Sequence, residues 1–136
     1  MIVVDTNVIA ALVLPAESSN LAERLFLHQS EWAAPLLWRS ELRNMMATQM
    51  RADRLDLDAA LSMTERAEEV LAGREFAVDS ATVLRLAAES GCTAYDCEFV
   101  ALAGYLAAPF VTLDRQLLAA FPATAVNLRK IVTGRS

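Results

Sequence analysis

Histidine, cysteine and glycine are scarce in this chain, and each shortage excludes a class of active site. His28 is the only histidine in 136 residues, so acid–base chemistry with two histidines is excluded. It ends a predicted amphipathic helix, where we expect a structural role rather than a Ser–His–Asp or Cys–His site. Cys92 and Cys97 are five positions apart, which fits neither a CxxC redox pair nor a zinc knuckle. The four glycines are scattered and form no phosphate-binding loop.

Long apolar runs and a basic excess are also missing. The longest uncharged stretch, 99–113, contains Pro109 and is too short to span a bilayer, and the N-terminus lacks a secretory pattern. We therefore expect a cytoplasmic protein with no membrane contact, in which both thiols are free. The net charge of −5 argues against nucleic-acid binding through bulk charge alone. This charge does not exclude an enzyme whose acidic pocket binds cations that in turn contact the phosphate of a nucleic acid.

What the sequence does contain is an alternation of short apolar strands and helical patterns, typical of an α/β domain. A chain of this length predicts one domain, 1–136, with residues from about 130 to 136 as a loose basic tail. The alternation predicts a small parallel β-sheet of four or five strands flanked by helices. We expect the strands at 2–4, 32–34, 76–78, 110–112 and 125–128.

Helices are predicted between these strands from the spacing of apolar residues and from residues that begin or end helices. Asp56, Asp79 or Ser80, and Thr93 are expected to cap helix N-termini, whereas Gly73 and Gly91 are expected to stop helices. The expected helices are 8–14, 17–28, 36–51, 56–72, 80–91, 93–107 and 115–121. Apolar residues make up 55% of the chain, so we expect a partner to cover part of that surface.

Two aspartates follow directly on apolar strands. Asp5 comes after Ile2-Val3-Val4, and Asp114 comes after a β-run that ends at Thr112. In open α/β sheets, ligands collect at the carboxyl ends of the strands, so both carboxylates are placed where chemistry usually occurs. The alternative for each aspartate is a plain helix N-cap.

Three further carboxylates lie on apolar helix faces. Glu41 shares a face with Trp38 and Met45, although neutralisation by Arg39 or Arg43 is an alternative. Asp96 lies among apolar neighbours in the helix from Thr93, unless it caps a helix that begins later. Glu98 is a candidate second-tier acid or an arginine partner.

Four carboxylates brought together by a sheet would repel one another strongly. Such a cluster requires cations for stability, and oxygen ligands without histidine or thiolate suit Mg²⁺ or Mn²⁺. Paired divalent ions on carboxylates are a common arrangement for phosphodiester cleavage.

These segments together resemble a known family. Asp5-Thr6-Asn7 after the first strand, Ser40-Glu41-Leu42, Thr93-Ala94-Tyr95-Asp96 and Val111-Thr112-Leu113-Asp114 are similar to the motifs of PIN domains. The closer resemblance is to VapC-type toxins of bacterial toxin–antitoxin pairs, especially over residues 95–103. It covers essentially the whole chain, in the expected order and spacing.

The resemblance implies a PIN-like fold and a metal-dependent endoribonuclease that cleaves structured RNA such as tRNA or rRNA. It implies that Mg²⁺ or Mn²⁺ is held by four acids, with support from Asn7, Thr112 and, less uniformly, Glu98. It also implies a homodimer restrained by a VapB-type antitoxin. Met45, Met46 and Met50 are adaptable apolar residues that could line such a binding surface, and plain core packing is the alternative for them. The four acids are Asp5, Glu41, Asp96 and Asp114.

Three alternatives belong to other classes. A phospho-accepting receiver domain would have adjacent acids after the first strand and a lysine after the last core strand, but Thr6 and Asn7 follow Asp5, and the lone lysine, Lys130, lies near the tail. A haloacid-dehalogenase-like phosphatase needs a second aspartate at position 7. A catalytically silent PIN-like or receiver-like domain acting through protein binding would not need the retained acids.

Overall fold

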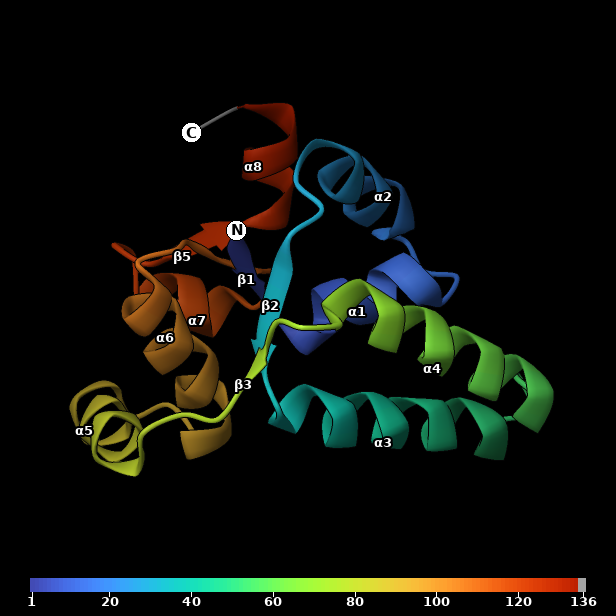
Figure 1. Ribbon diagram of the computed structural model, residues 1–136, viewed down its shortest axis with the longest axis horizontal. Helices are drawn as coiled ribbons and strands as arrows, with labels where there is room; N and C mark the ends of the chain where they lie inside the picture. Colours follow the sequence, from blue (N-terminus) through green and yellow to red (C-terminus); the bar gives the residue numbers. More distant parts are fainter. Residues whose placement is uncertain (135–136) are drawn as a thin grey trace.

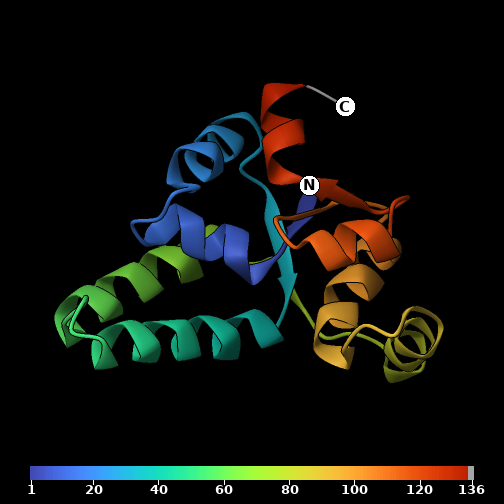
Figure 2. The same ribbon diagram turned by 180° about the vertical axis from the view of Figure 1, so that it is seen from behind.

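A computed structural model describes residues 1–134 of the chain. Five parallel strands form one sheet in the order β3-β2-β1-β4-β5. Figures 1 and 2 show helices α1 to α4 gathered on one face of the sheet and α5 to α7 on the other. The predicted parallel α/β fold is therefore confirmed.

The elements follow the chain in the expected alternation. The strands are β1 Ile2–Val4, β2 Trp32–Pro35, β3 Glu75–Phe76, β4 Phe110–Thr112 and β5 Ala125–Asn127. The helices are α1 Thr6–Val13, α2 Ser19–His28, α3 Leu37–Arg51, α4 Leu57–Leu71, α5 Ser80–Ser90, α6 Ala94–Leu106, α7 Arg115–Ala120 and α8 Leu128–Thr133. No helix within residues 1–134 is both long and apolar enough to cross a membrane.

Strand β1 lies at the centre of the sheet, and its side chains are apolar on both faces. Ile2, Val3 and Val4 are at most 5% exposed, since helices cover both sides of the sheet. Val4 lies beside Val111 of β4, so the two strands end at the same edge. The connections leave β1 and β4 in opposite directions, which makes the gap between these strands the place where such sheets bind ligands.

The chain after β5 differs from the prediction. The loose tail expected from residue 130 is wrong up to Thr133, because α8 spans Leu128–Thr133, and positions 135–136 lie outside the described residues. Asn127 caps this helix by accepting a hydrogen bond from the Arg129 N–H at 2.8 Å. Leu128 is fully buried, and Figure 1 shows α8 beside α2. This helix was not predicted from the sequence, because the basic residues of the segment were weighed and the one buried leucine that holds it to the core, Leu128, was not.

Arg39 joins three elements on one side of the sheet. Its Nε donates to Glu75 Oε1 at 2.6 Å and its Nη2 donates to Glu75 Oε2 at 2.9 Å, while Nη1 pairs with Glu68 of α4. The buried Trp38 indole donates to the same Glu75 at 2.7 Å. Hydrogen bonding by Arg39 holds the pKa of Glu75 below its usual value. Glu68 therefore helps to fix α3 and α4 against β3.

We expect Arg39→Met to lower the free energy of unfolding by about 1–2 kcal/mol, because Glu75 would lose its cation in a mostly buried position. Arg43→Met is the matched control, since Arg43 is exposed on the same helix and should cost less than about 0.5 kcal/mol. Urea denaturation of both variants measures the difference. Equal losses would contradict the role assigned to Arg39.

Candidate active site

Asp5 is the most buried acid of the molecule and lies where β1 meets α1. It is 8% exposed and its backbone N–H donates to the Val111 carbonyl at 2.9 Å, which ties it to β4. Its Oδ1 accepts from the Thr6 N–H at 2.9 Å and its Oδ2 accepts from the Thr112 hydroxyl at 2.7 Å. Asp5 therefore is an N-cap, as the simpler interpretation held, and is also bonded across the sheet.

Asp114 repeats this arrangement one strand away. Its Oδ1 caps α7 by accepting from the N–H groups of Gln116 and Leu117 at 2.8 and 3.2 Å. Its own N–H donates to Thr112 Oγ1 at 3.0 Å. Thr112, which is fully buried, thus receives a hydrogen bond from Asp114 and gives one to Asp5.

Glu41 reaches the same edge from α3, which follows β2. The ion pairs of residues 1–134 do not include Glu41, so the predicted alternative of neutralisation by Arg39 or Arg43 is wrong. Its Oε1 accepts instead from the Thr6 hydroxyl at 2.7 Å. This contact was not predicted from the sequence, because Thr6 and Glu41 lie 35 residues apart.

Asp96 and Glu98 come from the first turns of α6. Thr93 is the N-cap of this helix and accepts from the Asp96 N–H at 3.1 Å, so Asp96 is not itself the cap. Glu98 lines a hollow of about 370 Å³ beside Leu36 and Leu84. Burial raises the pKa of Glu98 above its usual value.

The acids influence one another electrostatically. Burial raises the pKa of Asp5 to about 6, against the hydrogen bonds from Thr112 and Thr6, and the charges of Asp96 and Glu41 raise it further. Burial likewise raises the pKa of Glu41, with added repulsion from Asp96 and Glu98. Burial also raises the pKa of Asp96, and the charge of Asp114 adds to it. Asp5, Glu41, Asp96 and Asp114 are therefore brought to one region of the molecule.

The arrangement fits a divalent cation by its chemistry but is not a preformed metal cage. The donors are all carboxylate oxygens, which Mg²⁺ and Mn²⁺ prefer. Burial and repulsion between the acids raise the pKa values of Asp5, Glu41 and Asp96, and a nearby cation would favour their charged forms. Asn7 Oδ1 is buried without a hydrogen-bond partner among the described residues, and its supporting role stays a prediction. Within residues 1–134, no three His, Cys, Asp or Glu side chains are arranged to hold one ion. The ligand roles stay a prediction.

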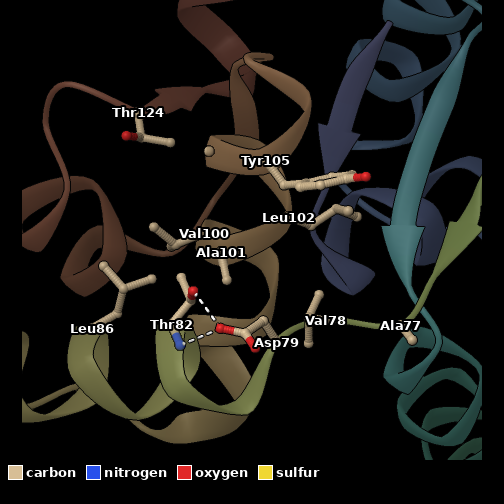
Figure 3. Close-up of a pocket in the computed structure, with 11 residues that line it drawn as sticks. Ala77, Val78, Asp79, Thr82, Leu86, Val100, Ala101, Leu102, Tyr105 and Thr124 are labelled. Carbon is tan, nitrogen blue, oxygen red and sulfur yellow. Dashed lines mark hydrogen bonds between the residues drawn. The ribbon is translucent and has the colours of Figure 1, made fainter.

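A separate hollow lies away from the acids. It measures about 580 Å³, lies between α5 and α6, and includes Val78, Leu86 and Tyr105 in its lining. Figure 3 shows that the one carboxylate in its lining, Asp79, is already bonded to Thr82. None of the four acids lines this hollow, so it is not the candidate active site.

Comparison with known proteins identifies the family. The PIN domain model matches residues 2–122. This chain belongs to the PIN domain family. It is also 36% identical to Ribonuclease VapC3 of Pyrobaculum aerophilum over 125 residues, which cover 90% of this chain and 95% of that protein. It is therefore a PIN-domain protein of the VapC type, as the motifs indicated.

Solved structures agree with the PIN fold. The crystal structure of PAE2754 from Pyrobaculum aerophilum has a TM-score of 0.78 at 24% identity, over 97% of this chain and 86% of that one. FitAcB from Neisseria gonorrhoeae has a TM-score of 0.75 at 20% identity, over 95% of this chain and 99% of its own. FitAB bound to an IR36 DNA fragment has a TM-score of 0.73, again at 20% identity, over 94% and 95% of the two chains.

The raised pKa of Asp5 predicts that this PIN domain becomes less stable as its acids ionise. The folded-state pKa, about 6, exceeds the ordinary 3.8, so the folded protein binds more protons than the unfolded chain between these values. The contribution of Asp5 to stability is therefore fully present below about pH 4 and is lost as the pH rises through about 6. This difference between the two pKa values corresponds to a loss of at most about 3 kcal/mol in the free energy of unfolding.

We expect Asp5→Asn, in EDTA at pH 7, to raise the free energy of unfolding by about 1–3 kcal/mol, because the amide is neutral. Its oxygen can still accept from Thr6, and its NH₂ can donate to the Thr112 hydroxyl. The difference in the free energy of unfolding between this variant and the wild type should become smaller as the pH falls towards 4. Urea denaturation across this pH range measures it, and a variant less stable than the wild type at pH 7 would refute the prediction.

Proposed function

We propose that this protein is a divalent-metal-dependent endoribonuclease and the toxin of a VapBC-type pair. The proposal is supported chiefly by the gathering of carboxylates at the β1–β4 edge of a PIN fold, where burial and mutual repulsion raise the pKa values of Asp5, Glu41 and Asp96. The ribonuclease relative, VapC3, supports RNA as the substrate. Structured RNA, such as tRNA or rRNA, is the substrate class that the family resemblance implies.

In this proposal the residues act mainly by holding charge in place. Asp5, Glu41, Asp96 and Asp114 would hold Mg²⁺ or Mn²⁺ through their carboxylate oxygens. The bound ion would supply a water of lowered pKa and offset negative charge on the phosphate under attack. Thr112 keeps Asp5 oriented by its 2.7 Å hydrogen bond. One carboxylate of the site accepts the proton that the attacking water releases.

The decisive assay incubates the purified protein with total RNA. We expect cleavage that needs Mg²⁺ or Mn²⁺ and is abolished by EDTA, and we expect Asp96→Asn to lower the rate at least about 100-fold without loss of fold. Asp58→Asn is the matched control, because Asp58 is an exposed aspartate in the first turn of α4. Wild-type cleavage in EDTA, or full activity of Asp96→Asn, would exclude this mechanism.

A catalytically silent domain that acts only by protein binding is the remaining alternative. It predicts no cleavage with any metal and no effect of Asp96→Asn on partner binding. The same assay therefore separates the two functions, since only the nuclease requires the four acids.

Exposed apolar side chains support the proposed protein partners. Leu57 and Leu61 of α4 are 59% and 54% exposed, near the helix from which Met45 and Met50 face outward in part. Met46, predicted with them, is only 3% exposed and belongs to the core. We assign the α3–α4 side to a VapB-type antitoxin. Tyr105 of α6, 82% exposed on the opposite face of the sheet, is assigned to a second copy of the chain.

We expect Tyr105→Glu to convert a homodimer into a monomer in light scattering, because a charge would enter an apolar contact. Leu61→Glu should leave the dimer intact and weaken antitoxin binding instead. A dimer that survives Tyr105→Glu but is lost with Leu61→Glu would reverse these assignments.

A further inference from the structure

Thr6 lies between two of the proposed metal ligands and contacts both. It is the first residue of α1 and is 4% exposed. Its backbone N–H donates to Asp5 Oδ1 at 2.9 Å, and its hydroxyl donates to Glu41 Oε1 at 2.7 Å. The second bond joins positions 35 residues apart and connects the end of β1 to α3. One residue therefore contacts two acids from different elements, Asp5 through its backbone and Glu41 through its side chain.

We propose that Thr6 is a positioning residue that holds Glu41 ready to bind the metal. This proposal rests on the proposed metal-dependent nuclease. A threonine hydroxyl has one proton, and here that proton is donated to Glu41 Oε1, which leaves Oε2 as the oxygen for the ion. The branched side chain restricts rotation about χ1, so the hydroxyl is held in one direction.

Glu41 depends on this hydroxyl because no cation replaces it. Arg39, two residues earlier on α3, is committed to Glu75 and Glu68. The ion pairs of residues 1–134 leave Glu41 out, and its side chain is only partly exposed. A partly desolvated carboxylate without a donor turns towards solvent or another donor. The Thr6 bond therefore decides where the Glu41 carboxylate points.

Thr6 and Thr112 together form a continuous hydrogen-bonded chain across the site. Glu41 accepts from Thr6, Thr6 donates to Asp5, Asp5 accepts from Thr112, and Thr112 accepts from the Asp114 N–H. Removing the Thr6 hydroxyl cuts this chain at Glu41 alone, because the bond to Asp5 uses the Thr6 backbone.

The test measures Mn²⁺ binding by electron paramagnetic resonance on the full chain, without RNA and at constant pH. We expect Thr6→Val to raise the Kd for Mn²⁺ by about 10- to 100-fold, as is typical when a partner of a metal ligand is lost. Thr6→Ser, which keeps the hydroxyl, should stay within about threefold of the wild type. Thr64→Val is the matched control, because its hydroxyl bonds the Ala60 carbonyl within α4 and no carboxylate.

A double-mutant cycle with Glu41→Gln separates positioning from general damage to the fold. If Thr6 acts through Glu41, Thr6→Val should not weaken Mn²⁺ binding further in the Glu41→Gln background. Additive losses, or a Thr6→Val variant that binds Mn²⁺ like the wild type, would overturn the role of Thr6. If the wild type binds no Mn²⁺ at all, the nuclease proposal fails, and the role of Thr6 fails with it. If Glu41→Gln weakens binding and Thr6→Val does not, only the Thr6 proposal is wrong.

Discussion

Hydrogen bonds from buried threonine hydroxyls allow mutually repelling carboxylates to share one edge of the sheet. Thr112 donates to Asp5 and Thr6 donates to Glu41, each at 2.7 Å. Burial and like charge both favour protonation, as the pKa of about 6 for Asp5 shows. Without these donors the charged forms would be far more costly to keep inside the protein. The fold thus maintains a region of unmet negative charge that a cation can neutralise.

The rest of the structure serves to hold this region rigid. Strand β1 lies at the centre of the sheet, and helices cover the sheet on both faces. Arg39 and Trp38 bind Glu75, which fixes the start of α3 against β3 and so fixes the helix that carries Glu41. Arg39, two residues before Glu41, is therefore used to hold the scaffold together. This division explains how a carboxylate remains unpaired beside an arginine.

The apolar parts of the structure were predictable because they depend on local pattern. The run Ile2-Val3-Val4 specifies a buried strand, and Thr93 and Gly91 specify helix boundaries through capping and a left-handed φ of 74°. The differences come from tertiary packing. Helix α8 was missed because Leu128 is buried and Ile131 and Val132 pack against the core despite their basic neighbours, and Met46 took the core position that was the alternative for it.

The order of the elements and the candidate acids could be predicted from the amino-acid pattern, because strand-end aspartates and apolar helix faces follow from spacing. The groups that donate hydrogen bonds to those acids are known only from the folded chain. Thr6 reaches Glu41 across 35 residues, and Thr112 reaches Asp5 across 107. Contacts at such separations depend on strand order and helix placement, which no local pattern encodes. The partner of each buried charge is therefore a property of the fold, whereas the charge itself is a property of the sequence.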